Sequence, residues 1–213
     1  AADWPQWRGP SRDGVAPGAR APDKWPGALK VIWTSPADPG YSSPVVASGR
    51  LYLHERKGGE EVVRALDAGT GKEIWRTSYA APYEAHPYAA RHGDCPKSTP
   101  TVDGGRVYTL GISGILHALD AETGKVLWKR DLGGEFKSMP LFGTSASPLV
   151  DSGLVIVPVG HKESGGGLMA FRRESGETAW RSVADGPSYA SPIAADLAGV
   201  RQVLGFTARR FVG

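Results

Sequence analysis

The side-chain types best suited to chemistry in this 213-residue chain gather in one long loop, residues 80–97. This loop carries His86, His92, Asp94 and Cys95, which are all side-chain types that bind zinc. Their spacing matches no strong metal motif, and a loop of this length inside a compact fold is usually functional or disordered. The sequence therefore predicts a capping loop with solvated side chains, and a zinc or calcium site is the alternative.

Hydroxyl side chains precede four prolines at equivalent points of the chain. A serine or threonine stands one residue before each of Pro44, Pro100, Pro148 and Pro192. Side chains two residues apart lie on one face of a strand, so the residues one and three before each proline predict a polar funnel. The candidate lining is Tyr41, Ser43, Lys97, Thr99, Ser145, Ser147, Tyr189 and Ser191, with Lys137 nearby as a further positive charge. This funnel is a candidate site for a small polar or anionic ligand, unless the small residues are there only because converging strands leave little room.

Sequence motifs give hydrolysis little support. No G-x-S-x-G elbow, phosphate-binding loop or H-E-x-x-H sequence occurs, and GTSAS at 143–147 fails at its last position. Catalytic triads are defined by geometry and not by motif, so a hydrolase that uses the funnel and the 80–97 loop stays an alternative. His117 stands beside Leu116 and Leu119 and is predicted to be packed in the core.

Three copies of one sequence supply the elements that must position these residues. They read ALDAGTGKEIW at 65–75, ALDAETGKVLW at 118–128 and AFRRESGETAW at 170–180. The tryptophans at 75, 128 and 180 give a period of 53 and then 52 residues. A period of this size, rich in Val, Ile, Leu and Tyr, is typical of a four-stranded propeller blade.

Each repeat predicts four antiparallel strands, such as 42–48, 50–56, 62–68 and 72–78. The fourth blade lacks its outermost strand, and residues 30–35 are a surplus strand of that type. We therefore predict a strap over residues 1–29, which packs its tryptophans against the outside of the sheets, and a propeller over residues 30–213. The strand at 30–35 completes the last blade of the same chain or of a partner, unless the natural chain continues. A four-blade ring is tight, so an eight-blade homodimer formed by strand exchange is the favoured arrangement.

The repeat resembles the PQQ-like, or quinoprotein-type, β-propeller family. Its tryptophan-docking motif is matched in full around Trp75 and Trp128, whereas Arg172 and Ser175 replace two motif residues in the copy that ends at Trp180. The resemblance implies that these three tryptophans are structural, and we expect looser docking in the third copy. The opening WPQWRGP at 4–10 resembles the start of secreted bacterial members.

The resemblance also defines three functional predictions. In the family's dehydrogenases a tryptophan and a vicinal disulfide hold the quinone, and carboxylates bridge a calcium ion. This chain has a single cysteine, Cys95, and no asparagine, so PQQ is not expected to bind. The leading prediction is a binding and assembly scaffold, followed by the hydrolase and then by a quinoprotein dehydrogenase.

Charge and hydropathy argue against a nucleic-acid-binding protein and against a membrane-spanning one. The net charge is only +3 and no run of five basic residues occurs, which argues against nucleic-acid binding. No apolar stretch of 18 residues predicts a membrane span. The small residues that begin the chain are typical of the site after signal-peptide cleavage, so a periplasmic or secreted protein is expected.

Overall fold

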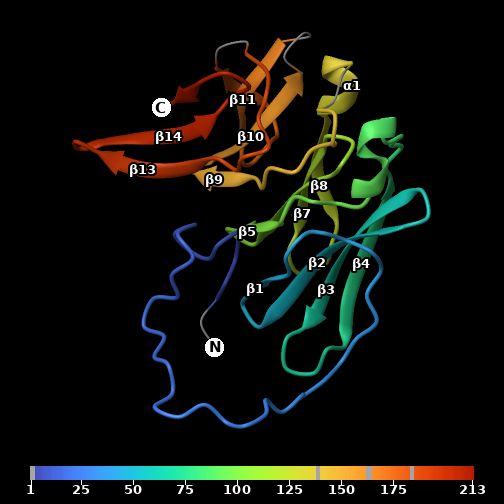
Figure 1. Cartoon of the computed structure of the whole chain (residues 1–213), viewed down its shortest axis with the longest axis vertical. Helices are drawn as coiled ribbons and strands as arrows, with labels where there is room; N and C mark the ends of the chain where they lie inside the picture. Colours follow the sequence, from blue (N-terminus) through green and yellow to red (C-terminus); the bar gives the residue numbers. More distant parts are fainter. Residues whose placement is uncertain (1–2, 138–139, 162–164, 183–184) are drawn as a thin grey trace.

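The computed structural model describes residues 3–137, 140–161, 165–182 and 185–213, and its strands form four antiparallel sheets (Figure 1). Each of the first three sheets contains four strands in chain order. They are β1 (Val45–Ala47), β2 (Arg50–Lys57), β3 (Glu60–Asp67) and β4 (Glu73–Ala80); β5 (Thr101–Asp103), β6 (Arg106–Leu110), β7 (Ile115–Asp120) and β8 (Val126–Asp131); β9 (Leu149–Asp151), β10 (Leu154–His161), β11 (Gly165–Arg172) and β12 (Thr178–Arg181). The last sheet holds β13 (Ile193–Leu197), β14 (Val200–Phe206) and β15 (Phe211–Val212). The prediction of an all-β chain built from propeller blades is confirmed.

Two short helices interrupt the strands. A 3₁₀ helix, η1 (Pro87–His92), lies in the long loop after β4, and α1 (Leu132–Phe136) follows β8. The side chain of Asp131 accepts a hydrogen bond from the backbone N–H of Gly134 and so caps α1. Among the described residues, no helix is long and apolar enough to cross a membrane.

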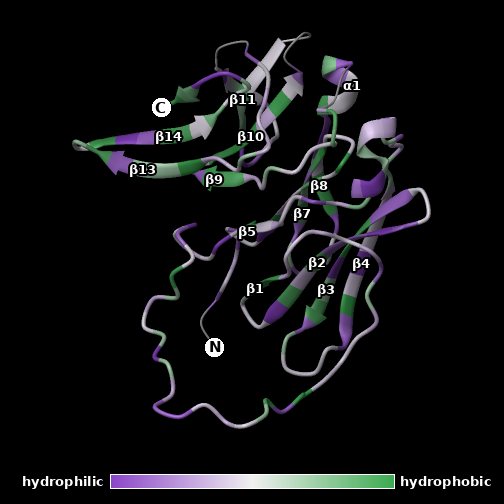
Figure 2. Cartoon of the chain, viewed as in Figure 1, coloured by the Kyte–Doolittle hydropathy of each residue, from purple (hydrophilic) through white to green (hydrophobic). Residues whose placement is uncertain are grey.

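The first three sheets pack face to face, and most residues of their middle strands β3, β7, β10 and β11 are buried. Tyr108 and Trp128 of the second sheet share one apolar cluster with Val157 and Phe171 of the third. A second cluster joins the first two sheets. Figure 2 shows hydrophobic and hydrophilic segments following one another along the strands.

Trp75 and Trp128 each contact the turn of the next repeat. The indole N–H of Trp75 donates to the carbonyl of Ala121 over 3.0 Å, and that of Trp128 donates to the carbonyl of Arg173 over 2.9 Å. The rings lie so close to Gly124 and Gly176, respectively, that neither position has room for a Cβ. These contacts link successive sheets through the outer strands.

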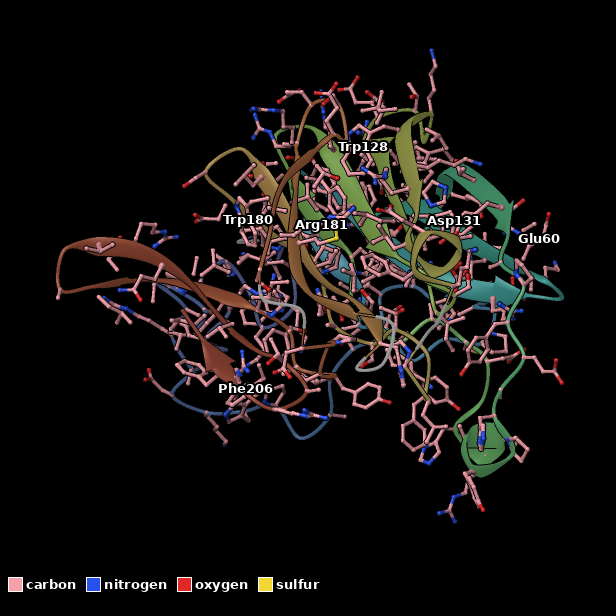
Figure 3. All side chains as sticks on the ribbon, turned by 90° about the horizontal axis from the view of Figure 1, so that it is seen from above. Glu60, Trp128, Asp131, Trp180, Arg181 and Phe206 are labelled. Atoms are coloured by element: carbon pink, nitrogen blue, oxygen red, sulfur yellow. The ribbon has the colours of Figure 1, made fainter. Side chains whose placement is uncertain are left out.

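The altered turn of the third repeat receives Trp128 and not Trp180. The bond to Trp128 uses a backbone carbonyl, so it survives the loss of the motif's Asp and Thr side chains. Trp180 is half-buried and packs beside Leu149, Ile156 and Ala170. Figure 3 labels both tryptophans, which lie on successive sheets.

The N-terminal strap crosses the inner strands and does not lie outside the sheets as expected. Trp4 and Val46 of β1 exchange two backbone hydrogen bonds of 2.7 and 3.0 Å, and the carbonyl of Pro5 accepts the N–H of Val102 in β5. The guanidinium of Arg12 donates to the carbonyls of Pro148 and Ser147, over 2.7 and 3.0 Å. The inner strands leave backbone groups free at their edges, and the strap pairs with these groups.

The rest of the N-terminal segment is exposed. Residues 13–32 form a wide loop away from the sheets, blue in Figure 1, in which Trp25 is 66% exposed. Trp25 therefore does not anchor the strap.

Arg12→Ala should lower the free energy of unfolding by about 3 kcal/mol, because two buried carbonyls lose a charged donor. Arg12 is 4% exposed, and burial lowers its pKa to about 10. Arg8→Ala is the matched control, since Arg8 lies at the same 5.5 Å from the Trp7 ring but donates to the exposed carbonyl of Asp13. Urea unfolding of both variants checks the prediction, and equal losses would contradict it.

Residues 30–35 lie in no strand of the described chain. Trp33 nevertheless donates to the carbonyl of Ala68 over 3.1 Å and covers Gly71. This is the contact that Trp75 makes with the second repeat, so Trp33 occupies the place of a tryptophan from a preceding blade. Its neighbours Val31 and Ile32 are 72% and 82% exposed.

Candidate functional site

Eight of the nine predicted funnel residues surround one cavity of about 470 Å³. They come from the starts of all four inner strands: Tyr41, Ser43, Lys97, Thr99, Ser145, Ser147, Tyr189 and Ser191. Trp7 of the strap and several apolar residues of the last sheet complete the wall. Phe206, one of these, is labelled on β14 in Figure 3.

The hydroxyls of the cavity link neighbouring inner strands. The backbone N–H of Ser43 donates to Thr99 Oγ1 over 3.2 Å, that of Thr99 to Ser147 Oγ over 3.0 Å, and that of Ser147 to Ser191 Oγ over 2.8 Å. A residue before proline is held extended, so its N–H is free to point at the next strand. The small polar residues therefore form hydrogen bonds between neighbouring blades. A lack of room between converging strands does not by itself explain these hydrogen bonds.

Phe142 organises one side of the cavity and was not predicted from the sequence. Its carbonyl accepts from Lys97 Nζ over 2.7 Å, and its N–H donates to the hydroxyl of Tyr189 over 3.3 Å. Burial lowers the pKa of Lys97 below its ordinary value. No local pattern marks Phe142, because its partners lie more than 40 residues away in the chain.

Lys137 is the one predicted funnel residue that the structure places elsewhere. It ends α1 in the left-handed conformation, with φ at 50°, and its side chain is exposed. The capped helix turns the chain away from the cavity, which is why proximity in sequence misled the prediction.

The four candidate metal ligands of the 80–97 loop have separate partners. His86 caps η1 and stacks on Tyr88, with ring centres 5.2 Å apart. His92 meets the edge of Phe142 at 5.0 Å. Cys95 is half-buried, and its thiol lies 3.8 Å from a carboxylate oxygen of Asp94.

Asp94 itself forms an ion pair with the buried guanidinium of Arg56, at 3.1 Å. In the part of the chain that the structure describes, no three His, Cys, Asp or Glu side chains are placed to hold one metal ion. The loop is thus held to the first sheet by an ion pair, and its candidate ligands do not form one set.

A buried polar cluster between the first two sheets was also missed. Glu61 is fully buried and accepts from the Tyr79 hydroxyl and the Ile112 N–H, each over 2.7 Å. His54 Nε2 lies 3.4 Å from the same carboxylate, and the ring of His117 packs against that of Tyr79 at a tilt of 44°, with ring centres 4.1 Å apart. Burial raises the pKa of Glu61, but hydrogen bonds to His54, Ile112 and Tyr79 outweigh it, so the pKa is lowered overall. The predicted packing of His117 is confirmed, since it is 2% exposed.

His117 should make the fold sensitive to acid. Burial, with His54 and Lys129 nearby, lowers its pKa from 6.5 to about 4. The unfolded chain therefore binds more protons between these values, so stability falls as the pH drops from 6.5 towards 4. The shift corresponds to about 3 kcal/mol. Urea midpoints at pH 7 and pH 4.5 should differ less for His117→Phe than for the natural chain, and an unchanged difference would contradict the assignment.

Four antiparallel sheets, linked by tryptophan-bearing repeats around a shared cavity, define a β-propeller of the quinoprotein type. The chain belongs to the family described as "Outer membrane protein assembly factor BamB", which matches residues 59–213.

Relatives of two kinds share these repeats. Quinohemoprotein alcohol dehydrogenase ADH-IIG of Pseudomonas putida is 32% identical over 66% of this chain and 19% of the relative. Outer membrane protein assembly factor BamB of Yersinia pestis is 28% identical over 65% of this chain and 31% of the relative. The chain thus matches between 19% and 31% of the length of these curated relatives.

A solved structure agrees with this assignment. Quinohemoprotein alcohol dehydrogenase from Comamonas testosteroni superposes with a TM-score of 0.50 at 28% identity, over 69% of this chain and 21% of that one. A europium-containing methanol dehydrogenase gives a TM-score of 0.53 at 23% identity, over 74% of this chain and 27% of that one, and this likeness concerns the fold alone.

Proposed function

We propose that the chain is a binding and assembly scaffold and not an enzyme. The observation that carries the proposal is the use of the cavity hydroxyls of Thr99, Ser147 and Ser191, which accept backbone N–H groups of neighbouring blades. A catalytic hydroxyl instead donates to a general base. Among the described residues that line the cavity, none is His, Asp or Glu, so this lining offers a hydrolase neither an imidazole nor a carboxylate base.

The same lining argues against the quinone dehydrogenase. A calcium ion beside the quinone needs several oxygen ligands, mainly from carboxylates and amides. The described lining offers neither group. Lys97 is the one cationic side chain in this lining, whereas the quinone cofactor carries several carboxylates that need neutralising. The residues that line the cavity therefore do not fit the cofactor.

Titration with PQQ and calcium tests the proposal. We expect no PQQ absorbance to remain with the protein after gel filtration, and no dye reduction with alcohols. Elemental analysis of the purified chain should find less than one zinc or calcium ion per molecule. Stoichiometric retention of PQQ together with dye reduction would overturn the scaffold proposal.

The assembly we propose pairs residues 30–35 with β15 of a second copy. Trp33 already contacts the turn at Ala68 and Gly71, as a tryptophan from a preceding blade does, while the exposed Val31 and Ile32 have no strand partner in the described chain. Within the described residues β15 pairs with β14 only. Strand addition would satisfy both edges.

We also propose a periplasmic or secreted location. The WPQWRGP start and the match to a family described as an outer membrane protein assembly factor support it. A signal peptide encoded upstream of Ala1 would be the direct test, and an upstream sequence without one would contradict the location.

A further inference from the structure

The cavity leaves several hydrogen-bond donors free for a ligand. Thr99, Ser147 and Ser191 each use an oxygen lone pair to accept a backbone N–H, so their own O–H groups remain to donate. Within the described part of the chain none of these hydroxyls donates a hydrogen bond. Lys97 has three N–H donors and uses one of them on the carbonyl of Phe142. These donors, and the charge of Lys97, therefore favour a ligand that presents acceptor atoms.

Aromatic rings form the apolar part of the wall. Trp7 is held in place by Arg8 and Arg12, whose guanidinium groups lie 5.5 Å from its ring centre. Tyr41 and Tyr189 line the same cavity and are 61% and 45% exposed, so their rings are accessible. Fixed and accessible rings of this kind favour stacking with a planar ligand.

The charge of the wall limits the ligand to one negative charge. Lys97 is the only charged side chain among the described residues of the lining. It can neutralise one carboxylate, whereas a second buried carboxylate would stay unpaired at a high cost in free energy. The volume of about 470 Å³ lies in the range of sites for small ligands.

We infer that the cavity binds a small aromatic monocarboxylate, with the carboxylate at Lys97 and the hydroxyls and with the ring among Trp7, Tyr41 and Tyr189. This inference rests on the proposed non-catalytic scaffold, because a scaffold binds the ligand and leaves it chemically unchanged. A ligand with one carboxylate also distinguishes this cavity from a site that holds a quinone with several carboxylates.

Calorimetric titration with phenylacetate and with phenylacetamide tests the inference. The two probes have the same ring and nearly the same shape, and only the acid carries a charge. We expect the acid to bind at least about tenfold more tightly than the amide, the factor that corresponds to one good charge-assisted hydrogen bond. Equal affinity for both probes would overturn the inference.

Two matched variants separate the cavity lysine from general charge effects. Lys97→Met should remove the preference for the acid, whereas Lys137→Met, which makes the same change outside the cavity, should keep it. Loss of the preference in both variants would overturn the site. If Lys97→Met fails to fold, Trp7→Leu and Tyr41→Ala are used in its place, and each should weaken binding of phenylacetate. Unchanged affinity for phenylacetate in both variants would overturn the inference.

The two experiments distinguish a wrong ligand inference from a wrong scaffold proposal. If phenylacetate does not bind, the aromatic carboxylate site is wrong while the scaffold proposal stands. If PQQ is retained and supports dye reduction, the scaffold proposal is wrong whatever phenylacetate does.

Discussion

Replacing Trp75 or Trp128 with alanine is expected to lower the free energy of unfolding by about 3–5 kcal/mol. Trp75 and Trp128 are only 8% and 9% exposed, and each donates to a carbonyl of the following repeat. Their removal leaves a cavity between two sheets, and the carbonyls of Ala121 and Arg173 each lose one of their hydrogen-bond donors. Thermal and urea unfolding of the purified variants would measure the loss.

Trp180→Ala is the internal control for these two variants. Trp180 occupies the same repeat position but is only half-buried, and it packs on one cluster of the third and fourth sheets. We expect a loss of about 1–2 kcal/mol, from burial alone. Equal losses at all three positions would contradict the role assigned to the repeat turns.

Glu61→Gln is expected to destabilise the interface of the first two sheets by about 3 kcal/mol, because buried donors lose a charged acceptor. Gln keeps the shape of the side chain and one acceptor oxygen. It loses the charge that faces His54 and one of the two acceptors used by Tyr79 and Ile112. Urea unfolding at pH 7 checks this value.

The control for this change is Glu60→Gln on the same strand. Glu60, labelled in Figure 3, is exposed, so the same substitution should change stability by less than about 0.5 kcal/mol. A loss for Glu60→Gln equal to that for Glu61→Gln would show that the effect belongs to β3 in general and not to the buried cluster.

The repeat carried most of the information about the fold. The 53-residue spacing of Trp75 and Trp128 predicted the blades, because each tryptophan ends one four-stranded unit and contacts the next. The role of Trp33 was harder to see, since its segment is not a strand here and only the contact with Ala68 and Gly71 reveals its place. The position of the strap also escaped prediction, because Arg12 binds carbonyls 135 residues further along the chain.

Strand alternation located the cavity, since the residues before the four prolines meet there. The sequence could not assign the hydroxyls their partners, because each hydrogen bond joins two blades 44 to 56 residues apart. The buried pair of His54 and Glu61 carried no motif for the same reason. Long-range packing decides which polar residues are buried together, and single-sequence patterns do not contain it.

Light scattering of the purified chain at several concentrations tests the assembly scaffold most directly. If residues 30–35 of each copy complete the last blade of the other, the measured mass is about 45 kDa, twice the 22.5 kDa of one chain. Deletion of residues 1–35 should then cause aggregation through the exposed edges. A monomer of 22.5 kDa at all concentrations would contradict the proposed assembly.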